Sequence, residues 1–211
     1  MRTVVCFDLD GTLFDSSAGI YASLQQACLQ QGVTPPEYEA LVSCIGPPLR
    51  DYLPFLLNVS EKECQSILAA FRTHHDTEGY LAYRLYPDVE PVLAQLADTG
   101  HPLYAATNKP FAVSCAALRH FGLLERFLNV YCPDGSSLAS GLQDHNKRTV
   151  LTQIKLSFDP AEVVYVGDTA SDQDAATQAN VGFIHAGYGY GCGIQAERRI
   201  DNLSGLLALI R

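Results

Sequence analysis

The sequence lacks an excess of basic residues. Lys and Arg number 14 against 23 Asp and Glu, which gives a formal net charge of −9 at pH 7. A protein that binds the backbone of a nucleic acid needs clustered Lys and Arg to displace counterions from the phosphates. We therefore expect no nucleic-acid partner, and an anionic ligand would have to be bound by a few local cations.

Long apolar runs are also missing. No stretch approaches the ~20 apolar residues that a helix needs to span a bilayer, and the N-terminus enters a strand at once without the pattern of a signal peptide. We therefore expect no membrane partner, and we expect a cytoplasmic location.

The sequence contains no C-x-x-C pair. Its seven cysteines are odd in number and spread along the chain, which is typical of reduced core residues rather than of a disulfide framework or a zinc site. With 47% hydrophobic and 18% charged residues, the composition is that of an ordinary globular protein. A chain of 211 residues can form one domain, or a core domain with a smaller insertion.

What the sequence does contain is an alternation of strand and helix patterns with one interruption. A strand is predicted over about residues 3–9, followed by a helical stretch over 17–82 that is broken at "QGVTPPE", "CIGPPLR" and "LNVSEKE". From Pro87 onward, helices separate strands at "PLYAATN", "FLNVYC", "EVVYVGD" and "VGFIHAG", and "LSGLLALI" is predicted as the last helix. Strands joined in this way indicate right-handed crossovers and a parallel sheet covered on both faces.

The predicted fold class is therefore α/β. We expect a doubly wound, Rossmann-like parallel sheet formed by residues 1–15 and 86–211, with an inserted all-helical cap domain over 16–85. In such a sheet ligands bind in the crevice outside the carboxyl ends of the strands. The residues at those ends are therefore the candidates for a functional site.

Acids, one hydroxyl, one amide and one lysine gather at this predicted edge. Acids on alternate positions of an extended segment point to the same side, so both acids of the first strand can reach one bound group. Each residue alone also has an ordinary reading as a helix cap, a turn residue or a solvated charge. The residues in question are Asp8, Asp10, Thr107, Asn108, Lys147, Asp168 and Asp172.

The motifs "DLDGT", "TN", the single Lys147 and "GDTASD" in this order resemble the haloacid dehalogenase superfamily of phosphatases. Together with "IGPPLRD", "LYPDV" and "HAGYGYG", they look like the helically capped subgroup of phosphoglycolate phosphatases and 5′-nucleotidases. The resemblance covers essentially the whole chain. It implies a magnesium-dependent phosphatase that acts on a small phosphomonoester through an aspartyl-phosphate. The chain departs from many relatives at Arg148, where proline is frequent, and at Asp88, where glycine is frequent.

The chemistry of these residues agrees with that implication. A carboxylate that attacks a phosphate dianion meets repulsion of about 4 kcal/mol for each unit pair at ~4 Å and an effective dielectric of ~20, so cations are required. Asp8 and Asp168 offer the oxygen ligands that Mg²⁺ prefers, and Asp172 would hold a metal-bound water or orient Lys147. By resemblance, the main chain of Asp10 completes the metal site.

Each side chain then has an expected role. Asp8 would be the nucleophile, and Asp10 would protonate the leaving group and then deprotonate water. Lys147 would offset the developing charge, while the Thr107 hydroxyl and the Asn108 N–H would donate to phosphate oxygens.

The cap carries further candidates. In "IGPPLR", Gly46 would allow close approach to the substrate and Arg50 would contact an anionic tail. We expect hinges near residues 15–18 and 80–86, with Asp15 in the first. His74 and His75 are adjacent and cannot face one another on a helix, which favours a surface position for both. We assign no role to "GYGYG" at 187–191 beyond that of a flexible loop beside the site.

Two other functions remain open. A β-phosphoglucomutase-like sugar phosphotransferase would share the core motifs and differ in its cap. A non-enzymatic phospho-accepting regulatory domain also sets an Asp, a Thr and a Lys at strand ends, but it needs neither a cap nor Asp10. The identity of the phosphomonoester is not determined by the sequence, and both a monomer and a homodimer are compatible with it.

Overall fold

The computed structural model describes residues 2–133, 138, 146–158 and 161–210. Its centre is a six-stranded sheet in the order β5-β4-β1-β6-β7-β8, in which all paired strands run parallel. From β1 the chain builds one side of the sheet through β4 and β5, and it then crosses to the other side and adds β6, β7 and β8. The strands are β1 (Val4–Phe7), β4 (Leu103–Ala106), β5 (Asn129–Tyr131), β6 (Val163–Gly167), β7 (Gly182–Ala186) and β8 (Arg199–Ile200).

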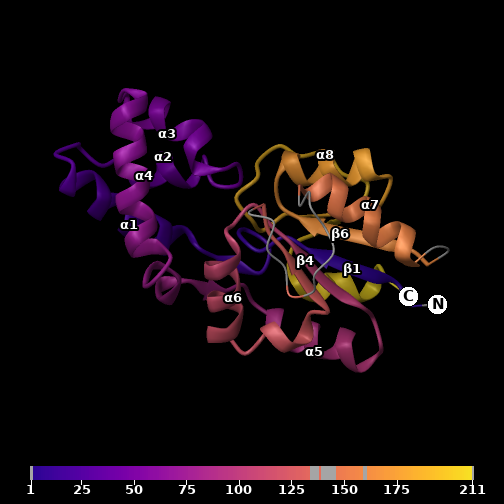
Figure 1. The fold of residues 1–211 in the computed structure, drawn as a ribbon. Coiled ribbons are helices and arrows are strands. Elements are labelled where there is room, and N and C mark those ends of the chain that lie inside the picture. Colours follow the sequence, from indigo (N-terminus) through magenta and orange to yellow (C-terminus); the bar gives the residue numbers. More distant parts are fainter. Residues whose placement is uncertain (1, 134–137, 139–145, 159–160, 211) are drawn as a thin grey trace.

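Helices cover both faces of this sheet (Figure 1). Alternate residues of β1 belong to different cores: Val5 and Phe7 pack with α5 and α6, whereas Val4 and Cys6 pack with α7 and α8. The doubly wound α/β fold predicted from the alternation is thereby confirmed. The helices are α5 (Val89–Asp98), α6 (Phe111–His120), α7 (Lys147–Phe158) and α8 (Ala170–Ala179), with 3₁₀ turns η2 (Leu124–Arg126) and η3 (Leu203–Ala208).

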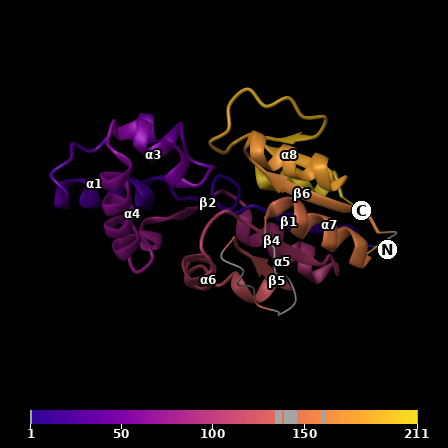
Figure 2. The same cartoon turned by 45° about the horizontal axis from the view of Figure 1, so that its top comes forward.

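A group of helices with a core of its own stands to one side of the sheet (Figures 1 and 2). Leu24, Leu41, Leu53 and Ile67, one from each helix, are fully buried there. No helix in the described part of the chain is long and apolar enough to cross a membrane. The elements of this group are α1 (Ser17–Gln30), α2 (Tyr38–Val42), α3 (Leu49–Leu57), α4 (Glu61–His75) and the 3₁₀ turn η1 (Gly79–Ala82).

The chain leaves the core and returns to it through a small antiparallel ribbon. Strand β2 (Phe14–Asp15) pairs with β3 (Arg84–Leu85), with Phe14 opposite Leu85 and Asp15 opposite Arg84. Both ends of the helical group are therefore neighbours in space, at the positions where the sequence predicts hinges. The structure adds β2, β3 and β8 to the predicted strands, and the segment predicted as the last helix is the 3₁₀ turn η3.

Candidate active site

The first part of the site is the turn that follows β1. The N–H groups of Thr12, Leu13 and Phe14 all donate to the carbonyl of Leu9, at 3.2, 2.8 and 2.9 Å, and fold the chain tightly behind the strand end. Gly11 lies in this turn at φ +78°, and a Cβ there would come within 2.0 Å of a carboxylate oxygen of Asp168. Glycine is therefore required for the turn to approach β6.

Asp8 and Asp10 flank the start of this turn, and each has its own lysine. Asp8 Oδ2 lies 3.1 Å from Lys147 Nζ, and Asp10 Oδ2 lies 2.9 Å from Lys109 Nζ. The second carboxylate oxygen of each acid is buried, and it has no hydrogen-bond partner among the described residues. Each acid thus has one oxygen that is held and one that is available to a bound group.

Asp172 fixes the position of Lys147. At the start of α8, Asp172 Oδ2 accepts from the main-chain N–H and the hydroxyl of Thr169, at 3.0 and 2.7 Å, in a capping box. Its Oδ1 is left to accept from Lys147 Nζ at 2.6 Å. Both oxygens of Asp172 are therefore engaged, which favours orientation of Lys147 over direct metal ligation.

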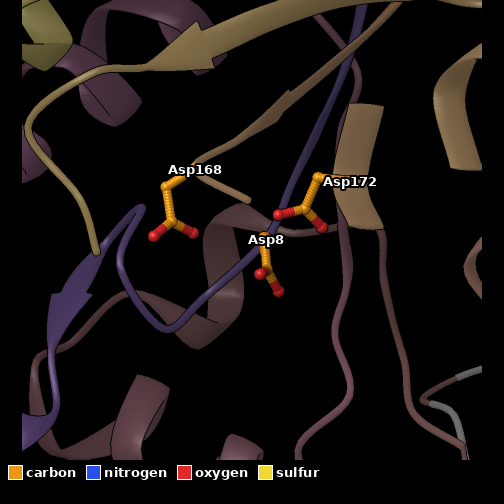
Figure 3. A group of neighbouring side chains, drawn as sticks. All are labelled: Asp8, Asp168 and Asp172. Carbon is orange, nitrogen blue, oxygen red and sulfur yellow. The ribbon is translucent and has the colours of Figure 1, made fainter. Parts of the chain in front are cut away.

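Asp168 follows β6, and its side chain lies near Asp8 and Asp172 (Figure 3). One carboxylate oxygen from each of these three acids lies within 4.8 Å of the other two. Asp168 Oδ2 accepts from the N–H of Tyr190 at 2.7 Å, and Oδ1 is buried without a partner among the described residues. The three acids come from two adjacent strands and one helix at the point where the strand order reverses.

The electrostatics of the site call for a cation. Burial, with added repulsion from neighbouring acids, raises the pKa of Asp8 to about 7 and that of Asp168 to about 8. For Asp172, the charge and hydrogen bond of Lys147 outweigh the effect of burial, and its pKa is lowered. Counting Asp10 and Lys109 as well, four carboxylates face two ammonium groups, so the fully ionised site carries two surplus negative charges.

A divalent metal ion fits this site. The carboxylates of Asp8 and Asp168 offer hard oxygen ligands at neighbouring strand ends, and Asp168 Oδ1 has no hydrogen-bond partner among the described residues. Mg²⁺ is bound in proteins by one or two carboxylates together with water and substrate oxygens. Such an ion would balance the two surplus charges. Asp8 and Asp168 are therefore the residues that would hold it.

The predicted phosphate-binding residues follow β4 at the same edge. Thr107 is buried, and its hydroxyl accepts from the N–H of Lys109 at 3.2 Å. The side chain of Asn108 donates to the carbonyl of Gly46 at 3.3 Å, which links the core to the loop before α3. A Cβ on Gly46, at φ +134°, would lie 2.6 Å from Thr169. Gly46 therefore lies against the site.

Arg50 is not drawn into this cluster. Its guanidinium pairs with the adjacent Asp51 at 3.4 Å, and its side chain is 69% exposed. Among the described residues, it makes no ion pair with an acid of the site. Its contact with a substrate stays a prediction.

Three features of the site were not predicted from the sequence. The first is the ion pair between Lys109 and Asp10. In the sequence, the only signal for this role was the position of Lys109 in "TNK" at the end of a strand. The "GYGYG" segment has a definite place, because Tyr190 binds Asp168 and a Cβ on Gly189 would lie 2.4 Å from the Asp168 side chain. The surface position predicted for His75 is wrong: it is 4% exposed, and its ring bonds Tyr83.

The geometry defines a class of protein: an α/β protein with a separate helical group and with an acidic site, able to bind a metal ion, at the point where the strand order of its sheet reverses. Residues 5–186 match the family model described as haloacid dehalogenase-like hydrolase. The chain belongs to this haloacid dehalogenase-like hydrolase family.

Curated relatives carry several names. The chain is 31% identical over 189 residues to the tyrosine-protein kinase PtkA of Mycobacterium tuberculosis, which covers 89% of this chain and 63% of PtkA. It is 30% identical to a 5′-nucleotidase of Pseudomonas aeruginosa (89% and 83% covered) and 33% identical to a phosphoglycolate phosphatase of Yersinia pseudotuberculosis (90% and 82% covered). The chain thus spans less than two thirds of the length of PtkA.

The fold is shared with solved structures. A haloacid dehalogenase-like hydrolase family protein from Streptococcus pneumoniae superposes with a TM-score of 0.85 at 22% identity, over 99% of this chain and 98% of that one. This similarity extends the agreement in fold to the helical group as well as the sheet.

Proposed function

We propose that this protein is a magnesium-dependent phosphatase that hydrolyses a small phosphomonoester through an aspartyl-phosphate on Asp8. The observation that carries the proposal is the state of the Asp8 carboxylate. One of its oxygens is held by Lys147 at 3.1 Å, and the other is buried near Asp168 and has no hydrogen-bond partner in the part of the chain that the structure describes. A nucleophile needs this arrangement, because the attacking oxygen must be oriented and free of competing hydrogen bonds.

In the first half of the reaction, Asp8 Oδ1 forms a bond to phosphorus as the bond to the leaving oxygen breaks. Asp10 gives its proton to that oxygen. When bound by Asp8, Asp168 and the main-chain carbonyl of Asp10, Mg²⁺ would supply the positive charge that offsets repulsion between carboxylate and phosphate. Lys147 adds a fixed charge beside the nucleophile.

In the second half, a water oxygen attacks the phosphorus of the aspartyl-phosphate, and Asp10 takes a proton from that water. The bond between phosphorus and the Asp8 oxygen breaks, which releases inorganic phosphate and restores the carboxylate. Throughout, the Thr107 hydroxyl and the Asn108 N–H would donate to the non-bridging phosphate oxygens. The N–H of Asn108 has no main-chain partner among the described residues and is available for this.

The helical group formed by residues 16–85 would act as a cap domain. The hydrogen bond from Asn108 to the Gly46 carbonyl brings its loop over the carboxyl edge of the sheet. A cap in this position would exclude water during the first half and open for the second. The cytoplasmic location expected from the sequence stays a prediction.

The names of the relatives support a small phosphomonoester as substrate. Two of them are a phosphoglycolate phosphatase and a 5′-nucleotidase, whose substrates share a phosphate on an alkyl oxygen. PtkA extends further beyond the part that this chain matches than these two relatives do, so phosphate transfer to tyrosine is an alternative outcome of the test below.

The test is a panel assay of purified protein with Mg²⁺. Phosphoglycolate, nucleoside monophosphates, sugar phosphates and 4-nitrophenyl phosphate are incubated, and inorganic phosphate is measured. We expect release from at least one compound, complete loss in Asp8→Asn, and an acyl-phosphate on Asp8 that hydroxylamine cleaves. Parallel assays follow sugar-phosphate isomerisation and transfer from ATP to a tyrosine peptide. The proposal fails if no compound releases phosphate.

A further inference from the structure

A chain of buried polar side chains runs from Asp10 out of the core. Lys109 Nζ lies 2.9 Å from Asp10 Oδ2 and 2.8 Å from the hydroxyl of Tyr83. The Tyr83 hydroxyl lies 2.6 Å from His75 Nε2, and His75 Nδ1 lies 3.3 Å from Asp76 Oδ1. Lys109, Tyr83 and His75 are each at most 6% exposed. None of the roles proposed above uses these three residues.

The donors and acceptors in this chain can be assigned. An ammonium group has donors only, so Lys109 donates to both Asp10 and the Tyr83 oxygen. The Tyr83 proton is then left for His75 Nε2, which must accept it. Burial, together with the positive charge of Lys109, lowers the pKa of His75 and keeps the ring neutral, with its proton on Nδ1 facing Asp76. Each hydrogen bond therefore has one direction.

The three residues lie in three different parts of the molecule. Lys109 follows β4 in the core, whereas His75 is the last residue of α4 in the helical group and stacks on Phe71 at 4.6 Å. Tyr83 immediately precedes β3, and its ring packs on Phe14 of β2 at 6.0 Å. The hydrogen-bonded chain thus passes through the ribbon on which the cap would turn.

We propose that Lys109, Tyr83 and His75 are positioning residues that couple the position of the cap, relative to the core, to the orientation of the Asp10 carboxylate. The inference rests on the proposed function, in which Asp10 transfers the proton. Lys109 holds Oδ2 and leaves the buried Oδ1 as the oxygen that serves the leaving group. If the cap turns about the ribbon, His75 moves with it, and the Tyr83 hydroxyl that Lys109 contacts loses its acceptor. Proton transfer is then efficient only with the cap in place.

The test uses leaving groups that differ in their need for an acid. Tyr83→Phe removes one hydroxyl and keeps the ring in the core. We compare kcat/KM, which reports on the first half of the reaction, for the best alkyl phosphate of the panel and for 4-nitrophenyl phosphate, whose leaving group needs little protonation. Because a hydrogen bond to a charged group contributes about 1.5–3 kcal/mol, we expect a loss of about tenfold or more with the alkyl phosphate. With 4-nitrophenyl phosphate we expect less than about a twofold loss.

Two further variants complete the design. Lys109→Met should show the same dependence on the leaving group, only more strongly. Tyr80→Phe is the matched control, because the Tyr80 ring packs on His120 at 6.1 Å and is not part of the hydrogen-bonded series from Lys109 to His75. Its kcat/KM should be unchanged for both substrates. Thermal unfolding establishes that each variant is folded.

The outcomes separate the two proposals. Equal losses of Tyr83→Phe on both substrates, or no loss on either, would overturn the positioning role while leaving the phosphatase intact. Absence of turnover in the unchanged protein overturns both.

Discussion

The raised pKa values of Asp8 and Asp168 predict how the stability of the metal-free protein changes with pH. Both acids bind a proton more tightly in the folded protein, with pKa values of about 7 and about 8, than in the unfolded chain, where a value of about 3.9 is normal. The folded state therefore carries more protons than the unfolded state between these limits. It follows that stability is lost as pH rises from about 4 to about 8.

The magnitude can be worked out for the interval from pH 6.5 to pH 8. For each proton that only the folded state holds, the free energy of unfolding falls by about 1.4 kcal/mol for each unit that the pH rises. Asp168 keeps most of its excess proton over this interval and Asp8 keeps about half, which gives a loss of about 2 kcal/mol. For a protein of this size that corresponds to a fall of roughly 4–8 °C in Tm. His75 and His185, whose pKa values are lowered by burial, titrate mainly below this interval.

The assay is thermal unfolding followed by circular dichroism, since the chain has no Trp for fluorescence. In EDTA we expect Tm to fall from pH 6.5 to pH 8, and with saturating Mg²⁺ we expect the fall to disappear because the bound ion keeps both acids ionised. Asp168→Asn should remove more than half of the fall. The reasoning is refuted if Tm in EDTA is flat or rises over this interval, or if Mg²⁺ raises Tm equally at both pH values.

Three substitutions, with one control substitution, test the roles of two acids and of one tyrosine. Asp10→Asn should lower kcat by about 10²–10⁴-fold, which is the usual contribution of a general acid and base. The control is Asp174→Asn, because Asp174 is exposed, and it should change kcat less than about twofold. Similar kcat values for the two variants would contradict the assignment of Asp10. Asp172→Asn leaves Lys147 short of a charged partner at 2.6 Å and should lower kcat about 10- to 100-fold, and an unchanged rate would remove Asp172 from the site. Tyr190→Phe removes the hydroxyl bonded to Asp15 at 3.0 Å and should lower the free energy of unfolding in urea by about 1–3 kcal/mol, a prediction that an unshifted midpoint would disprove.

Much of the sheet could be predicted because the information lies in local sequence. Buried strands such as Val4–Phe7 and Val163–Gly167 are continuous apolar runs. Between the strands lie segments whose apolar residues recur with the spacing of a helix. Strands β2, β3 and β8 have two residues each, which is too few for any period to be recognised. Their pairing is determined by the packing around them, and no local pattern reports it.

The same distinction applies to the site. Asp8 and Asp168 could be predicted because each directly follows a recognisable strand, and the sheet brings strand ends together. The role of Lys109 depends on Asp10, which is distant in sequence and reaches it only because β4 lies beside β1. For His75, the rule that adjacent helical residues point apart was correct, but it does not say which of the two faces the protein interior. Its burial follows from where Tyr83 enters the core.

The position of β1 at the centre of the sheet has a consequence for the order in which the chain folds. The partners of β1 are distant along the chain: Val5 pairs with Leu103 and Val4 with Val163. The helical group, in contrast, is one continuous segment with contacts close in sequence, which favours rapid folding. During synthesis we expect this group to fold while β1 is still unpaired, because the ribosome has not yet made its partner strands. The strand that directly precedes both proposed catalytic acids therefore leaves the ribosome before its partner strands and is paired only after they have been made.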